Sequence, residues 1–361
     1  MTVITGLFSE DTALLLGDIL TSIETTDSTY PYLPTVGLYP SQATTKATFK
    51  PFSYFQKVNL LSPKLAVAWS GSKDEATSYF NEIISTQSHI NPKIENLINI
   101  TNDINPDLQI IGMLMEKDRY HWFSRNCKLI DNCRIDASET LVGGSGMSKF
   151  LEFTEFLDFH FPDGNPTKRD MLLGKALGII GVLLSEEIRT GSTIRDLFGA
   201  GYEIVLIDEN NNFKKFSDIT YVFWDVGKDK ESGNNFIRPI LINKYFYEDD
   251  QLFIRSFIPN DYPNFEKNTI CVPPIFRFSP KTMISSSSIQ DLNSNNIVSI
   301  YFTEVEGKVY ATSRIVINSS NELRPIVFSI TNKDEINFSI NLEIVNDHIK
   351  KFFSDFNIDY G

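Results

Sequence analysis

The stretch that decides the fold is TVITGLFSEDTALLLGD, residues 2–18. Two runs of β-forming and apolar residues, at 3–7 and 13–17, flank a polar turn at residues 9–11. Apolar runs of this length separated by a short polar turn are the pattern of a β-hairpin. The sequence therefore predicts a hairpin at the start of the chain, with Asp18 directly after its second strand.

Thr2 has a distinctive chemical position because it follows Met1. Removal of the methionine would expose a free α-amino group, whose ordinary pKa of about 8 leaves a fraction of it unprotonated at neutral pH. This amine can serve as the base for the hydroxyl of the same residue, so one residue supplies both nucleophile and base. The alternative interpretation is that Thr2 only begins a β-strand.

Up to about residue 220, groups of strands alternate with groups of helices. Apolar residues at 76, 79, 80, 83 and 84 have helical spacing, which predicts a helix from Lys73. Further helices are expected at 93–101, 148–160 and 169–189, and strands at 57–61, 64–69, 109–116, 120–124, 140–144, 203–208 and 213–216. Residues 21–51, rich in Thr, Ser, Pro and Tyr, indicate a long loop or hairpin insertion. This grouping favours stacked sheets with separate helical layers.

The composition changes after residue 221. The β-type runs at 237–258, 270–278, 297–302, 309–317 and 325–340 are broken by Asn, Ser, Asp and Gly, and only 342–356 has a helical pattern. We expect residues 226–361 to form a β-rich C-terminal domain appended to the first 225 residues. An elaboration packed onto the first part is the alternative.

Four segments together resemble one known superfamily. They are TVITGLFSEDTALLLGDILTS (2–22), with Asp18 sixteen residues after Thr2; KVNLLSPKLAVAWSGSKDEATSYFNEI (57–83); VGGSGMSKFLEF (142–153); and DLFGAGYEIVLID (196–208). In this order they resemble segments of proteasome β-subunits and of the bacterial HslV peptidase, which are Ntn-hydrolases. The resemblance implies an α+β fold, a four-layer α/β/β/α Ntn-hydrolase sandwich, for residues 1–225.

The same resemblance implies roles for individual residues. It makes Thr2 the nucleophile and its own amine the base, and it places the Asp18 carboxylate beneath the nucleophile. Ser145 would lie near the terminal amine, supported by Asp196, and the backbone N–H of Gly71 would stabilise the oxyanion. Removing one such oxyanion donor costs about 3 kcal/mol of transition-state stabilisation.

Two positions depart from the family pattern. The family's lysine, taken to precede the Lys-Val pair by five residues, falls on Phe52. Lys50, two residues away, lies on the same strand face and is the expected substitute, with Lys46 or no lysine as alternatives. Gly199 stands where the family commonly has a serine, which removes one hydroxyl near the terminal amine.

The resemblance implies a threonine N-terminal nucleophile hydrolase that cleaves an amide or peptide bond through an acyl-enzyme at Thr2 and that assembles into a homo-oligomeric ring. A different class of function remains as the alternative. It is a catalytically inactive proteasome-like scaffold that binds a protein partner through its C-terminal region, and Phe52 and Gly199 favour it.

Composition excludes several other functions. The 361 residues carry a formal charge of −13, which argues against a nucleic-acid partner because phosphate binding needs a concentrated positive surface. No targeting signal and no apolar run near the roughly 20 residues of a membrane span is present, so we expect a cytoplasmic protein without a membrane partner. The three cysteines and four histidines form no metal-ligand pattern, and residues 143–146 lack a phosphate-binding lysine. We therefore expect neither a metal nor a cofactor.

Overall fold

The computed structural model describes residues 2–24, 32–35, 37–38, 49–130, 139–155, 167–228, 235–259, 265–277, 294–305, 308–317, 324–332 and 335–356. In this part of the chain, six helices accompany several mostly antiparallel sheets. The expected α+β class is therefore confirmed. No helix among these residues is long and apolar enough to cross a membrane.

The predicted N-terminal hairpin forms the centre of the first sheet. Strands β1 (Ile4–Ser9) and β2 (Thr12–Asp18) pair antiparallel, with Ile4 opposite Gly17. The sheet has the order β11-β12-β1-β2-β13-β14. Its other strands are β11 (Lys128–Ile130), β12 (Glu139–Gly143), β13 (Tyr202–Ile207) and β14 (Phe213–Lys215). Almost every residue of β1 and β2 is buried, because both faces of this sheet are covered.

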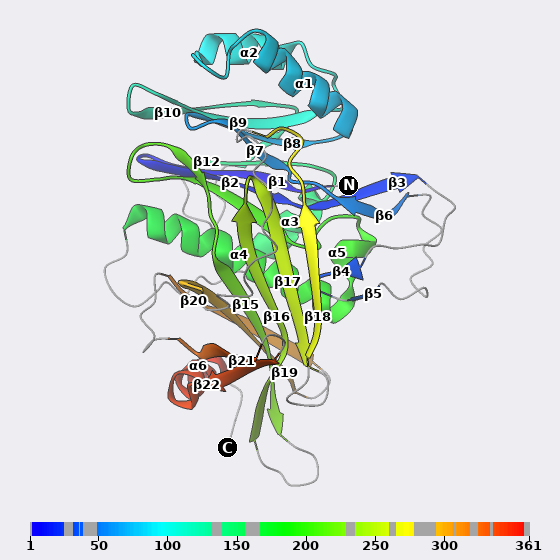
Figure 1. Cartoon of the computed structure of the whole chain (residues 1–361), viewed down its shortest axis with the longest axis vertical. Helices are drawn as coiled ribbons and strands as arrows, with labels where there is room; N and C mark the ends of the chain where they lie inside the picture. The colour runs from blue at the N-terminus through cyan, green and yellow to red at the C-terminus, as the bar shows by residue number, and fades with distance from the viewer. Residues whose placement is uncertain are drawn as a thin grey trace.

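A second sheet covers one face of the first. Its order is β10-β9-β8-β7, from β7 (Val58–Ser62), β8 (Leu65–Ser70), β9 (Gln109–Glu116) and β10 (Arg119–Arg125). Side chains of the two sheets share one apolar cluster, in which Phe8 and Leu15 meet Ala66 and Ile111. The helices α1 (Lys73–Ser85) and α2 (Ile94–Asn102) cover the outer face of this second sheet (Figure 1).

The opposite face of the first sheet is covered by helices. These are α3 (Met147–Glu155), α4 (Lys168–Thr190) and the short α5 (Ser192–Arg195). Thr167 caps α4 through a reciprocal pair of hydrogen bonds with Asp170, and Gly191 ends the helix in a left-handed conformation.

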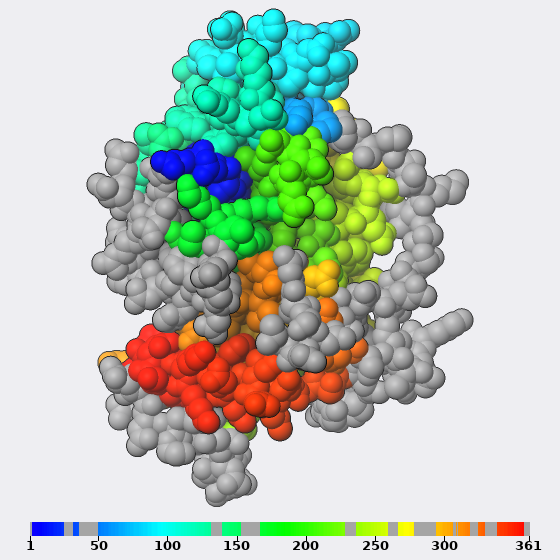
Figure 2. Space-filling model, turned by 90° about the vertical axis from the view of Figure 1, so that its left-hand side faces the viewer, coloured from blue at the N-terminus to red at the C-terminus, as the bar shows by residue number. Residues whose placement is uncertain are grey.

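Helix α4 is also covered on its far side, by a third sheet. This sheet has the order β18-β17-β16-β15-β19-β20. Its strands are β15 (Ile219–Lys228), β16 (Asn235–Glu248), β17 (Gln251–Pro259), β18 (Phe265–Val272), β19 (Asn296–Val305) and β20 (Lys308–Val316). One apolar cluster joins Leu177 and Ile180 of α4 to Leu16 on one side and Ile300 on the other. Figure 2 shows the green residues of α4 between the N-terminal layers above and the orange and red C-terminal residues below.

The remaining elements lie at one end and at one side of the molecule (Figure 1). β21 (Ile326–Asn332), β22 (Glu335–Ile340) and α6 (Leu342–Asp355) cover the outer face of the third sheet. Within the expected insertion at 21–51, β3 (Leu20–Glu24) pairs with β6 (Phe49–Tyr54), and β4 (Tyr32–Leu33) pairs with β5 (Gly37–Leu38). The expected domain boundary at residue 225 lies inside strand β15.

Candidate active site

Thr2 lies in a buried position next to the loop that joins β12 to α3. Its side chain and backbone are together only 4% exposed. The Thr2 N–H donates to Ser145 Oγ at 3.2 Å, and the Thr2 carbonyl accepts from the Gly146 N–H at 3.1 Å. A Cβ at Gly144, where φ is +97°, would lie 1.8 Å from the Thr2 carbonyl oxygen. Glycine is therefore required at position 144 for Thr2 to take this place.

Asp18 holds the N-terminal segment from the other side. It is completely buried at the end of β2. One carboxylate oxygen accepts from the Val3 N–H at 3.1 Å and the other from the Gly199 N–H at 2.9 Å. The Asp18 N–H in turn donates to the Val3 carbonyl at 3.1 Å. Asp18 therefore joins the start of the chain to the loop after α5.

The cation that faces Asp18 is Lys57, the residue before β7. Its side chain is buried, and its Nζ lies 4.0 Å from the centre of the Trp69 ring. Burial lowers the pKa of Lys57 to about 8, against the opposing effect of Asp18 and Glu203. Burial likewise raises the pKa of Asp18 to about 7, opposed by Lys57 and by the two N–H donors. Burial therefore shifts the pKa values of this aspartate and this lysine toward each other.

Gly17 explains how the lysine reaches this place. A Cβ on Gly17 would lie 2.9 Å from Lys57 Cβ and 3.0 Å from Val58 Cγ2. The two sheets therefore approach each other at Gly17 more closely than any side chain would permit.

A second buried charge pair lies beside the first. Glu203 accepts from the Val58 N–H at 2.7 Å and from Lys215 Nζ at 3.4 Å, and both side chains are almost completely buried. Lys215 Nζ also donates to the Gln56 side chain and, at 3.1 Å, to the Val58 carbonyl. This pair fixes the backbone on either side of Lys57.

The lysine whose charge acts on Asp18 is not the expected Lys50. Lys50 lies on β6, half-buried and opposite Ile23, whereas Lys57 is the lysine whose charge acts on Asp18. Phe52, at the expected family position, is 61% exposed, and Lys46 lies outside the described residues. One signal could have found Lys57. A lysine directly before the apolar run VNLL is expected to be buried, and a buried ammonium group needs a carboxylate nearby. Asp18 follows an equally apolar strand and needs a cation for the same reason.

The other expected residues lie as follows. Ser145 is exposed on the loop beside Thr2 and accepts its N–H. Asp196 is half-buried at the end of α5, three residues before the glycine that binds Asp18.

Gly71 has φ +126° in the turn between β8 and α1. Its neighbour Ser70 pairs with Gln109, and the Gln109 side chain accepts from the Gly144 N–H, so the turn lies at the same end of the sheets as Thr2.

Position 199 has a structural reason to be glycine. Its φ is +107°, and a Cβ there would lie 2.2 Å from Glu187 Oε2. The buried carboxylate of Glu187 therefore occupies the space beside position 199 that a side chain would need. The sequence indicates that a hydroxyl is missing at position 199, but it does not indicate the Glu187 carboxylate beside it.

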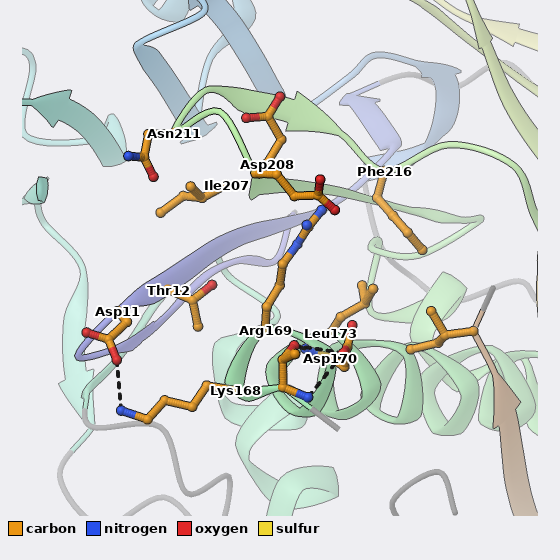
Figure 3. Close-up of a pocket in the computed structure, with 13 residues that line it drawn as sticks. Asp11, Thr12, Lys168, Arg169, Asp170, Leu173, Ile207, Asp208, Asn211 and Phe216 are labelled. Atoms are coloured by element: carbon orange, nitrogen blue, oxygen red, sulfur yellow. Dashed lines mark hydrogen bonds and ion pairs between the residues drawn. The ribbon is translucent and has the colours of Figure 1, made fainter. Parts of the chain in front are cut away.

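Two of the cavities among the described residues lie at the other end of the β1–β2 hairpin. The first, of about 710 Å³, lies between the hairpin turn and the start of α4 and is lined by Asp11, Lys168 and Asp208 among others (Figure 3). The second, of about 770 Å³, lies on the other side of the turn, next to Tyr120 and Trp122. In the first, Lys168 forms an ion pair with Asp11 at 2.9 Å. Neither cavity is lined by Thr2, Asp18 or Lys57.

Among the described residues, no three His, Cys, Asp or Glu side chains are grouped so that they could hold a metal ion. The chain matches no protein-family model, and no curated protein matches it significantly.

Proposed function

We propose that this protein is a threonine N-terminal nucleophile hydrolase that cleaves an amide or peptide bond, with Lys57 in the role expected of Lys50. The proposal includes the finer fold assignment, in which the layers from α1 and α2 through the two N-terminal sheets to α3 and α4 are an Ntn-hydrolase sandwich. The single observation that carries it is the position of Asp18. This buried carboxylate binds the backbone directly after Thr2 and also faces a buried lysine.

In the proposed mechanism, removal of Met1 turns the Thr2 nitrogen, now next to Ser145 Oγ, into a free amine. The amine takes the proton of the Thr2 hydroxyl, whose oxygen attacks the substrate carbonyl. The C–N bond then breaks, the leaving amine takes the proton, and an ester on Thr2 remains until water hydrolyses it. Lys57 supplies positive charge at the site, balanced by Asp18, and the Gly71 N–H is the proposed donor to the oxyanion.

The test combines intact mass with labelling by a peptide epoxyketone, an electrophile that reacts with an N-terminal threonine. We expect the expressed protein to lack Met1 and to gain one inhibitor mass. The Thr2→Val variant should not be labelled. Thr5→Val is the matched control, because Thr5 is also a buried threonine and lies on β1, three residues after Thr2. The Thr5 hydroxyl has no hydrogen-bond partner among the described residues. A protein that keeps Met1 in the presence of aminopeptidase would contradict the mechanism.

A second experiment tests the lysine. Lys57→Met keeps the apolar volume but removes the charge, so we expect labelling to fall at least tenfold, as when a preorganised charge is lost from an active site. Lys50→Met should be labelled like the wild type. The reverse result would restore Lys50 to the site and exclude Lys57.

One observation favours the second candidate function, a non-catalytic scaffold. Thr2 is only 4% exposed. A scaffold would show no labelling in any variant and would retain full stability when Thr2 is replaced by valine.

A further inference from the structure

Glu187 is a buried carboxylate that the proposed mechanism does not use. It lies in the last turn of α4 and is completely buried. Its Oε2 accepts from Thr193 Oγ1 at 2.9 Å and from the Ala200 N–H at 3.0 Å, and its Oε1 accepts from Thr35 Oγ1. Four segments of the chain therefore meet at this one side chain: α4, the insertion after β3, α5 and the loop after α5.

The loop that Glu187 binds has an unfavourable backbone conformation. Leu197, Gly199, Ala200 and Gly201 all have positive φ, with values of 58°, 107°, 62° and 146°. Residues with a side chain rarely adopt such angles, so Leu197 and Ala200 stay there only if neighbouring groups hold them. The hydrogen bond from Ala200 to Glu187 is one such restraint.

The same loop carries the donor to Asp18. The N–H groups of the adjacent residues Gly199 and Ala200 donate to two different carboxylates, Gly199 to Asp18 and Ala200 to Glu187. Successive N–H groups in a turn of this kind form a concave binding site for negative charge. The direction of the Gly199 N–H, and with it the position of Asp18, therefore depends on the bond that Glu187 makes one residue later.

Other titratable groups surround Glu187. The charge of Asp18, from β2, acts on Glu187, and the charge of Glu187 acts on Tyr54 of β6, Tyr202 of β13 and Tyr245 of β16. Burial raises the pKa of Glu187 to about 7, its three hydrogen bonds oppose this, and the charge of Asp18 raises it further. The charge of Asp18 therefore disfavours ionisation of Glu187.

We infer that Glu187 is a positioning residue for the Thr2 site: it holds the Gly199–Ala200 turn whose N–H group binds Asp18. The effect on catalysis rests on the proposed hydrolase function. The stabilisation of the Gly199–Ala200 turn by Glu187 does not depend on that function, and it can be measured separately.

Two variants separate geometry from charge. In Glu187→Gln, the amide oxygen can still accept from Ala200 and Thr193, and the Thr35 hydroxyl can turn to accept from the amide nitrogen. Glu187→Ala removes every one of these contacts. Glu186→Gln is the matched control, because Glu186 is the preceding residue of the same helix and pairs with Arg189 near the surface.

The first measurement is the rate of epoxyketone labelling between pH 5.5 and 8.5. We expect Glu187→Gln to be labelled like the wild type across this range, because its amide oxygen keeps the acceptor that holds the turn. Glu187→Ala should be labelled roughly tenfold more slowly, since it leaves the Ala200 N–H unsatisfied. Glu186→Gln should behave like the wild type. A Glu187→Gln variant that is labelled as slowly as Glu187→Ala would overturn the inference.

The second measurement is amide hydrogen exchange of the peptide that contains Gly199 and Ala200. We expect roughly tenfold faster exchange in Glu187→Ala, and wild-type exchange in Glu187→Gln and Glu186→Gln, because only the alanine variant loses the acceptor. Equal protection in all variants would overturn the inference. If the wild type is not labelled at all, the hydrolase proposal fails, and this exchange experiment still decides whether Glu187 holds the turn. If Glu187→Ala does not fold, Thr193→Val, which removes one bond to Oε2, should give a smaller increase in the same peptide.

Discussion

At the scale of single residues, the candidate site depends on buried ionisable groups whose pKa values lie near neutral pH. Asp18 and Glu187 both have pKa values raised to about 7 by burial, and Lys57 has one lowered to about 8. Lys57 can be balanced by Asp18 only when Asp18 has lost its proton. We therefore expect the labelling rate to rise between pH 6 and pH 8, and a rate that is flat across this range would contradict the proposed role of Asp18.

The raised pKa of Glu187 also predicts how stability changes with pH. Because the pKa is higher in the folded state than in the unfolded chain, the protonated form favours folding, and this contribution is lost as the pH rises from about 4.5 to 7. Glu187→Gln should therefore stabilise the protein more at pH 8 than at pH 5. Urea denaturation at the two pH values measures the difference, and Glu186→Gln should show none.

The pair Glu203–Lys215 allows a comparison between buried and exposed charges. Lys215→Met would leave Glu203 buried without its cation, and we expect a loss of about 3–5 kcal/mol in the free energy of unfolding. Arg238→Met, at an ion pair whose arginine side chain is 68% exposed, should cost less than about 1 kcal/mol. Chemical denaturation measures both, and equal losses would show that the buried pair is already neutral.

Gly17 makes a steric prediction. Its replacement by alanine forces the new methyl group into Lys57 and Val58, so we expect a loss of about 1–3 kcal/mol in the free energy of unfolding, together with slower labelling. Gly181→Ala in α4 is the control. Its nearest neighbour would be 3.4 Å from the new Cβ, and alanine favours the helix, so this variant should be at least as stable as the wild type in the same denaturation experiment.

At the scale of elements, local patterns were sufficient for most of the first 220 residues. The predicted strand at 109–116 is β9, and the predicted helices from Lys73 and at 169–189 are α1 and α4 within one residue. These elements are set by alternation, helical spacing and caps, which a single sequence displays.

What the sequence did not show was the surroundings of each element. The pattern at 169–189 predicts a helix but not its environment, and the structure buries α4 nearly all round, because a sheet lies on each side of it. The parallel pairing of β15 with β19 joins segments that are far apart in the sequence, and no local pattern predicts it. Lys57 was missed for the same reason, since its partner Asp18 comes from another sheet.

The cap of α4 gives a prediction at this scale. Thr167→Ala removes the hydroxyl that accepts from the Asp170 N–H, which is one half of the capping box, and we expect a loss of about 1 kcal/mol in the free energy of unfolding. Thr77→Ala is the control. The Thr77 hydroxyl bonds to the carbonyl of Lys73 inside α1, and its removal should be neutral or slightly stabilising by thermal denaturation.

At the scale of the whole molecule, the N-terminal layers and the C-terminal sheet share one apolar core. Leu16, Leu177 and Ile300 belong to the same cluster, although they come from the first sheet, α4 and the third sheet. A fragment that ends at residue 217, before β15, would expose the far side of α4. We expect such a fragment to bind the dye ANS and to lose its cooperative thermal transition. A soluble fragment with a sharp transition would support the appended-domain interpretation instead.

The enclosure of α4 between two sheets also has a consequence for biosynthesis. The helix is complete at Thr190, but β20, which covers it, begins only at Lys308. A ribosome that adds about 5–20 residues per second needs several seconds or more to make the intervening chain. During that time β20 is not there to cover the apolar outer side of α4, so the N-terminal half exposes apolar surface until the last strands emerge.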